Sequence, residues 1–166
     1  MRMAGAAVIP FEYWRMARTI RAYLADLEMA AGMSVNKLQL GSANAEVKRM
    51  DVAARRFEDS LAKVMAMPAM PVLAEVNQAI YQVDQALLLR SGLPGRPWYK
   101  NAISAPGLYT GYGAKTLPGI REAMEAWNFE VAARQARALG RILQNVTARI
   151  DAATHLLDEA AASTSR

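Results

Sequence analysis

The only histidine of the chain lies four residues before a glutamate, a spacing that puts both side chains on one face of a helix. His155 and Glu159 together offer one nitrogen and one carboxylate to a metal ion. A closed zinc site needs four ligands, and the chain contains no cysteine and no HExxH motif. We therefore expect a surface pair here, and no metal or other cofactor bound by this chain.

Two further patterns are typical of phosphate or nucleic-acid contact. Arg134, Arg137 and Arg141 recur at helical spacing, but no aromatic residues interleave with them, so we expect a solvated helix face. The stretch "GYGAKT" lacks the spacing of a phosphate-binding loop, and we expect no strand before it. A single histidine in the last helical segment also rules out a Ser-His-Asp set. The sequence predicts no catalytic apparatus in this chain.

The composition is that of a soluble helical protein. Of the 166 residues, 53% are hydrophobic and 21% are charged, and the net charge of +5 permits an acidic partner without requiring one. No apolar run approaches the roughly 20 residues that cross a bilayer, and the apolar start stops too early, at Pro10, for a secretory signal. We expect a soluble segment, with a leader over 1–9 and one helical domain over 10–162; the compartment stays open.

Apolar residues recur at three- and four-residue steps, which is typical of amphipathic helices. This pattern predicts helices over 11–31, 42–67, 71–90, 118–127 and 128–158. The four long segments keep a seven-residue repeat; in 42–67 it comprises Val47, Met50, Ala54, Phe57, Leu61 and Val64. Helices with a common repeat of this kind pack at small crossing angles around one core. We therefore predict an all-α fold, a four-helix bundle.

The connection between the third and the last long helix, residues 91–119, is unusually long. It holds six of the ten glycines, four of the seven prolines and three of the six tyrosines. Stiff proline alternating with permissive glycine predicts an irregular but ordered backbone. The large aromatic residues of this loop either anchor it over the bundle or face a pocket or partner, and both alternatives stay open: they are Trp98, Tyr99, Tyr109 and Tyr112.

The loop sequence "GLPGRPWYKNAISAPGLYTGYGAKTLPGIREAME" resembles the C-terminal segment of the glutamate carboxypeptidase family, zinc metallopeptidases whose architecture is shared with the transferrin receptor. The start, "VIPFEYWRMARTIRAY", resembles the family's entry into its helical domain. The resemblance covers nearly the whole chain. The matching loop elements are Gly92-Leu93-Pro94, Arg96-Pro97-Trp98-Tyr99, Ala105-Pro106, Tyr112 and Pro118-Gly119-Ile120.

The resemblance implies a transferrin-receptor-like dimerisation domain with an up-and-down four-helix bundle. In the family this domain follows a protease domain, which holds two zinc ions, and an apical domain. The chain is then expected to pair with itself and to contact those two domains, without hydrolysing peptides alone and without contacting nucleic acid or membrane. The parent protein is expected to be a zinc-dependent carboxypeptidase.

The resemblance also implies a substrate role for the loop, which would help to close the pocket of the parent enzyme. In family members that prefer glutamate, a Lys-Tyr pair of this loop binds the carboxylates of the C-terminal glutamate. Tyr112 matches the tyrosine, but Gly111 stands at the lysine position. Lys115, four residues on, is the candidate replacement. Preference for acidic C-terminal residues is therefore open, and a broader carboxypeptidase activity of the parent is an alternative.

Two other classes of function stay open at this stage. The same fold can serve a non-catalytic assembly protein, as the resemblance to the transferrin receptor allows. A basic helical protein can also bind RNA or DNA, and salt-dependent affinity for arbitrary oligonucleotides would be the sign of that function.

Overall fold

The computed structural model describes residues 11–67, 74–108 and 113–164, so the expected leader lies outside the described residues. The described chain is mostly helical, as the sequence predicts. In chain order the elements are α1 (Tyr13–Ala31), the 3₁₀ helix η2 (Gly32–Ser34), α2 (Val35–Leu38), α3 (Gly41–Met65), α4 (Ala74–Ala86), β1 (Ser104–Pro106), β2 (Ala114–Thr116), α5 (Pro118–Glu125) and α6 (Phe129–Thr164).

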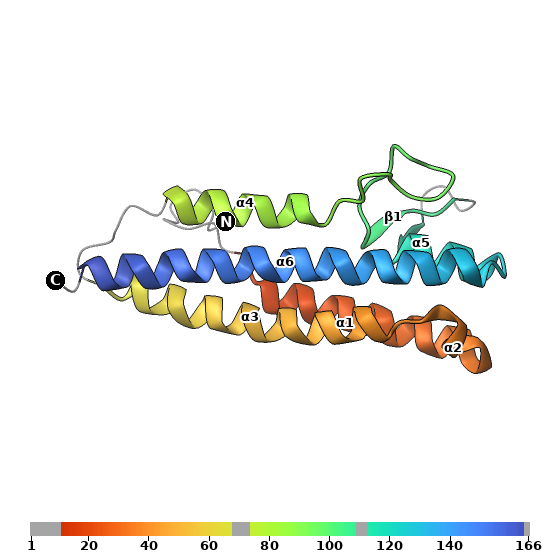
Figure 1. The fold of residues 1–166 in the computed structure, drawn as a ribbon, viewed down its shortest axis with the longest axis horizontal. Helices are drawn as coiled ribbons and strands as arrows, with labels where there is room; N and C mark the ends of the chain where they lie inside the picture. Colours follow the sequence, from red (N-terminus) through yellow and green to blue (C-terminus); the bar gives the residue numbers. More distant parts are fainter. Residues whose placement is uncertain (1–10, 68–73, 109–112, 165–166) are drawn as a thin grey trace.

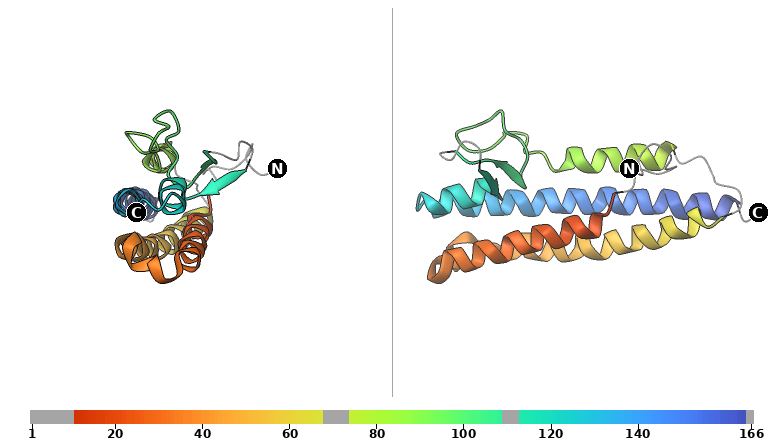
Figure 2. Two further views of the ribbon diagram at one scale, coloured as in Figure 1. Left: turned by 90° about the vertical axis from the view of Figure 1, so that its right-hand side faces the viewer. Right: turned by 180° about the vertical axis from the view of Figure 1, so that it is seen from behind.

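Helix α6 is the central helix, along which other helices pack (Figure 1). Helices α3 and α4 pack along it, α1 packs on α3, and α5 packs on α6 near its start. In the chain colouring, α1 and α4 run in one direction while α3 and α6 run in the opposite one. The two further views show α4 and α3 on different sides of α6 (Figure 2). We call α1, α3, α4 and α6 together the helical body.

The apolar stripes predicted from the sequence form the core of the helical body. All members of the α3 stripe are buried except Leu61, which is half-buried. The Phe57 ring meets the Tyr13 ring of α1 edge-on at 5.5 Å between centroids, and the Tyr13 hydroxyl donates to the carbonyl of Ile80 in α4 at 3.4 Å. Tyr13 therefore joins α1 to both α3 and α4.

Several predicted helix ends are wrong. The third long helix ends at Ala86 instead of 90, because the backbone beyond it pairs across the loop: the Leu89 N–H donates to the Lys100 carbonyl at 2.8 Å. The last helix continues past 158 to Thr164. The periodicity predicts no helix over residues 32–38, but these residues form η2 and α2.

The expectation of no strand before "GYGAKT" is also wrong. Strands β1 and β2 form a short antiparallel pair, with Ser104 opposite Thr116 and Pro106 opposite Ala114. Each strand has three residues, which is too short for an alternating pattern to show in the sequence. The pair protrudes from the helical body beside α5 (Figure 1).

Candidate functional site

The candidate site is the loop between α4 and α5, and we call its residues 87–117 the platform. Apolar side chains on the underside of the platform pack against α5 and α6. The platform contributes Leu89, Leu93, Ala102 and Leu117, and the helices contribute Ile120 and Leu139. These side chains leave a cavity of only about 10 Å³ between them. A well-filled layer of this kind holds the platform in one position on the body.

A tight turn at the beginning of the platform depends on glycine. Gly92 has φ +68°, and a Cβ at this position would lie 2.2 Å from the carbonyl oxygen of Pro97. The turn is closed by the Leu93 N–H, which donates to the Tyr99 carbonyl at 2.8 Å. Gly95 also has a positive φ, of +70°, but has open space around it.

Arg96 is the anchor of the platform. Its guanidinium is buried, and Nη2 donates to both carboxylate oxygens of Glu122 in α5 at 2.7 Å. Its Nη1 donates to the carbonyl of Pro106 in β1. The guanidinium also lies 5.2 Å from the centroid of the Tyr99 ring, within the range of cation–π attraction. One side chain therefore ties the first turn of the platform to β1 and to α5.

The same ion pair also holds the chain just before the segment that carries Tyr112. Glu122 accepts a hydrogen bond from the backbone N–H of Leu108 at 2.9 Å, two residues beyond the carbonyl that Arg96 binds. The Gly107 N–H donates to the Gly113 carbonyl at 2.8 Å, which closes the base of that segment. Tyr112 itself, with Gly111 and Tyr109, lies outside the described residues.

Lys115 lies on β2 and is already paired. Its ammonium contacts both carboxylate oxygens of Glu125 in α5, with 2.6 Å to Oε1. Its side chain is 22% exposed. A substrate carboxylate at Lys115 would have to replace Glu125 as the partner of this ammonium.

The two described aromatic residues of the turn, Trp98 and Tyr99, are exposed on the surface of the platform. Trp98 is 70% exposed and Tyr99 is 37% exposed, so Trp98 does not anchor the loop. Three further motif residues lie at the junction with the helices: Ala105 is buried, Pro118 is the first residue of α5, and a Cβ at Gly119 would lie 2.7 Å from Gln135 Oε1.

A small hollow of about 190 Å³ adjoins the base of the platform. Its walls are mostly apolar, with the carboxylate of Glu122 at one side. The lining residues are Pro94, Leu108, Gly119, Glu122, Ala123, Ala126, Asn128 and Val131. Leu108 and Pro94 are exposed parts of the platform, so the hollow opens beside the segment that leads to Tyr112.

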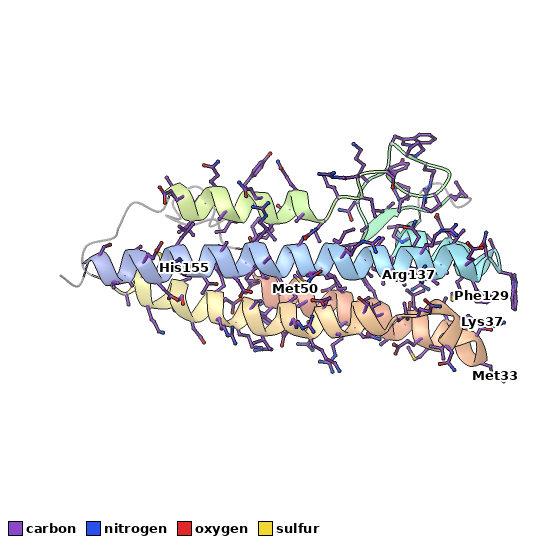
Figure 3. All side chains as sticks on the ribbon, viewed as in Figure 1. Met33, Lys37, Met50, Phe129, Arg137 and His155 are labelled. Atoms are coloured by element: carbon purple, nitrogen blue, oxygen red, sulfur yellow. The ribbon has the colours of Figure 1, made fainter. Side chains whose placement is uncertain are left out.

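His155, Arg134 and Arg137 lie away from the platform or on its far side, whereas Arg141 lines a hollow together with residues of the platform. His155 Nδ1 is 3.4 Å from Glu159 Oε2, with the two side chains 73% and 63% exposed, which confirms the surface pair. Arg137 donates to Gln39 Oε1 at 2.6 Å, and Arg134 pairs with Glu130 on an exposed face. Figure 3 shows His155 and Arg137 far apart along α6.

Over the described ranges 11–67, 74–108 and 113–164, no group of three or more His, Cys, Asp or Glu side chains is placed to hold a metal ion. Within the same ranges, no helix combines the length and the apolar character needed to span a membrane.

Sequence comparison agrees with the arrangement of helical body and platform. The family model of the transferrin receptor-like dimerisation domain matches residues 36–160, which include α3, α4, the whole platform, α5 and α6 up to residue 160. The chain is 30% identical over 125 residues to the probable glutamate carboxypeptidase LAMP1 of Arabidopsis thaliana, an alignment that covers 75% of this chain and 18% of that protein. A probable glutamate carboxypeptidase of Arthroderma benhamiae is 27% identical over 138 residues, covering 76% of this chain and 18% of its own length.

The chain thus spans about a fifth of the length of these relatives. The family model covers well over half of the 166 residues, and the matched segment includes the whole platform and the helical body apart from α1 and the last residues of α6. The chain belongs to the transferrin receptor-like dimerisation domain family.

Proposed function

We propose that this chain is the homodimerisation domain of a glutamate carboxypeptidase-like zinc peptidase, and that its loop, residues 91–119, helps to close the substrate pocket of the parent enzyme. The match to the dimerisation family, together with two relatives described as probable glutamate carboxypeptidases, carries the proposal. Because those relatives are much longer, the activity belongs to the whole parent protein.

In this proposal the helical body is an up-and-down four-helix bundle with the assembly role. The alternating directions of α1, α3, α4 and α6 support it, as do the contacts of α3 and α4 with α6 and of α1 with α3. The hydrogen bond from Tyr13 to the Ile80 carbonyl supports closure of the bundle between α1 and α4.

The platform has the substrate role. In this proposal the parent's protease domain holds the two zinc ions. The chain would contribute position: the Arg96–Glu122 pair bonds to the backbone at Pro106 and Leu108, just before the segment that carries Tyr112.

The substrate would be a peptide with a free C-terminal carboxylate. Tyr112 can supply one neutral hydrogen bond, worth about 0.5–1.5 kcal/mol. Gly111 supplies no ammonium, and Lys115 is paired with Glu125. This loop then offers a glutamate side chain no unpaired ammonium at these two positions, and the proposal is a parent that also accepts neutral C-terminal residues.

The test uses the full-length parent protein with Tyr112→Phe, and Tyr23→Phe in α1, away from the platform, as a matched control. Loss of one hydrogen bond should raise KM for dipeptides about 2- to 10-fold, with the same oligomeric state. The control should leave KM unchanged. Unchanged kinetics for Tyr112→Phe would remove this tyrosine from the pocket. Dipeptides ending in glutamate and in alanine, assayed side by side, would then show whether acidic residues are preferred.

A further inference from the structure

Helix α4 lies alongside α6 and leads into the platform (Figure 1), and an open groove runs between the two helices. This α4–α6 groove consists of two adjoining hollows of about 750 and 620 Å³, which share Gln85, Ala86 and Asn145. The second hollow extends onto the platform, where Arg90 and Lys100 line it. A partner that contacts the platform on this side therefore meets the groove as well.

Every charged side chain that lines the α4–α6 groove is cationic. Arg149 lines one hollow, and Arg90, Lys100 and Arg141 line the other. Among the described residues, none of these four cations forms an ion pair with a carboxylate. Arg149 donates instead to the neutral side-chain amide of Gln82, at 2.7 Å. The described part of the chain therefore leaves the positive charge of this groove uncompensated.

The cations on α6 follow the axis of the helix. Arg141, Asn145 and Arg149 are spaced by four residues, so they lie on one face. The rise of an α-helix places the two arginines about 12 Å apart along the axis, with the Asn145 amide between them. Beside them, Ala148 and Ala152 are exposed and small, so that another polypeptide chain can approach the helix closely.

We propose that the α4–α6 groove docks an acidic polypeptide segment of the parent's own protease domain. Carboxylates of that segment pair with Arg141 and Arg149, and the carboxylates nearest to the platform pair with Arg90 and Lys100. This inference rests on the proposed function, in which the platform meets the protease domain, and it names the face along which that contact continues.

Continuity and chain length favour this occupant. The platform and the groove share Arg90 and Lys100, so a domain that closes over the platform already lies at one end of the groove. The matched segment covers 18% of the length of each relative, so most of such a parent lies outside this chain but in the same polypeptide. A tethered segment has a high effective concentration, and a few charge contacts then suffice for docking.

Two other occupants fit the α4–α6 groove less well. A second copy that used the same groove would bring identical cations together about a twofold axis, and like charges disfavour association. A nucleic acid would gain phosphate contacts, but the described lining offers no aromatic side chain on which a base could stack.

The groove between α1 and α3, which we call the α1–α3 groove, offers a matched comparison. Arg18, Arg21 and Lys48 line it, so it is also rich in cations. It differs in two respects: it holds a carboxylate, Asp51, which pairs with Arg55, and none of its lining residues belongs to the platform. Charge changes in this groove therefore control for the total charge of the protein.

The test identifies the carboxylates that lie against Lys100 in the full-length parent protein. A carbodiimide joins a lysine amine directly to a neighbouring carboxylate, and mass spectrometry then identifies the joined peptides. We expect Lys100 to join Asp or Glu residues of the protease domain. Co-assembly of heavy- and light-isotope copies of the parent separates links within one polypeptide from links between two, and we expect links within one polypeptide.

Neutral variants test whether the charges hold the segment. Arg141→Gln combined with Arg149→Gln adds no new carboxylate, and it should lower the yield of the Lys100 links about fivefold. Arg141→Lys combined with Arg149→Lys keeps the charges and should stay within about twofold of the wild type. Arg18→Gln combined with Arg21→Gln, in the α1–α3 groove, is the matched control and should leave the yield unchanged.

The outcomes separate this inference from the proposed function. Lys100 links that never reach the protease domain, or that form only between two copies, overturn the inference and leave the dimerisation function standing. A yield that ignores the loss of both arginines does the same. Tight, salt-dependent binding of an arbitrary oligonucleotide that requires Arg141 and Arg149 overturns it in favour of a nucleic acid. A monomeric parent that keeps the links within one polypeptide overturns the dimerisation function alone.

Discussion

The helical body and the platform are held in place by different forces. In the body, stability is spread over many buried apolar side chains, and the largest of them that are fully buried include Tyr13, Phe57, Ile20 and Leu24. In the platform, one buried guanidinium and a set of backbone hydrogen bonds define the shape, above a thin apolar layer. The body is built on distributed packing, and the platform depends on a few specific contacts.

This difference matches the two proposed roles. A surface that pairs with another copy needs a rigid scaffold, and a packed helical core provides one. A loop that meets a substrate needs a defined backbone that can differ between relatives without changing the core. We therefore expect changes in the platform to alter its local order while the body keeps its helices.

The largest effect is expected in the core of the body. Phe57→Ala removes a fully buried ring that contacts the Tyr13 ring, and it should lower the free energy of unfolding by about 3–5 kcal/mol. Urea denaturation followed by circular dichroism measures this loss. A loss below about 1 kcal/mol would mean that packing at this position does not stabilise the body.

The next effect separates the two regions most clearly. Arg96→Met leaves the Glu122 carboxylate, 13% exposed, without its partner, which costs about 3–5 kcal/mol for a buried pair. We expect hydrogen exchange to accelerate at the Leu93 and Leu117 amides while the amides of α6 keep their protection. The double variant with Glu122→Met should recover part of the loss. Equal acceleration in α6 would show that the regions are not separable.

Two glycines of the platform form a matched pair for a third prediction. Both have a positive φ, but only Gly92 is crowded, with the Pro97 carbonyl 2.2 Å from an added Cβ. Gly95→Ala should cost about 1 kcal/mol from backbone strain alone. Gly92→Ala should cost about 2–4 kcal/mol, because the turn must also open. Similar melting temperatures for the two variants would contradict the close approach.

The smallest effect concerns a polar atom of the body. Among the described residues, Glu58 Oε1 is buried without a hydrogen-bond partner, and burial followed by the nearby Glu12 charge raises the pKa of Glu58. A raised pKa means that Glu58 binds its proton more tightly in the folded protein than in the unfolded chain. Protonated Glu58 therefore adds to the free energy of unfolding at low pH, and this addition is lost as the pH rises through the pKa of the folded state. Glu58→Gln should therefore be slightly more stable than wild type at pH 7, with the difference closing near pH 4. A variant less stable at pH 7 would contradict this sign.

The same contrast explains what could be predicted from the sequence. The apolar stripe of α3 and the extent of α1 follow from helical periodicity, because burial on one helix face repeats along the chain. The end of α4 at Ala86 could not be predicted this way, since the Leu89 N–H bonds to Lys100, a residue brought near only by the fold. The strands were missed for the same reason.

The anchor of the platform was also beyond sequence reasoning. Arg96 was recognised as part of a motif, but nothing in the spacing identifies Glu122 as its partner 26 residues later. The one sequence signal for a buried Arg96 was its position inside a Gly- and Pro-rich loop, whose backbone is expected to be ordered. Anchoring by the large aromatic residues was one of two open alternatives; Trp98 is exposed, and the contacts that hold the turn are those of Arg96.

The most direct test of the proposed function is the mass of this chain in solution, measured by light scattering after size exclusion across a dilution series. We predict a dimer of twice 18.1 kDa that persists on dilution into the low micromolar range. A mass of 18.1 kDa at every concentration would contradict the claim that the helical body alone carries dimerisation.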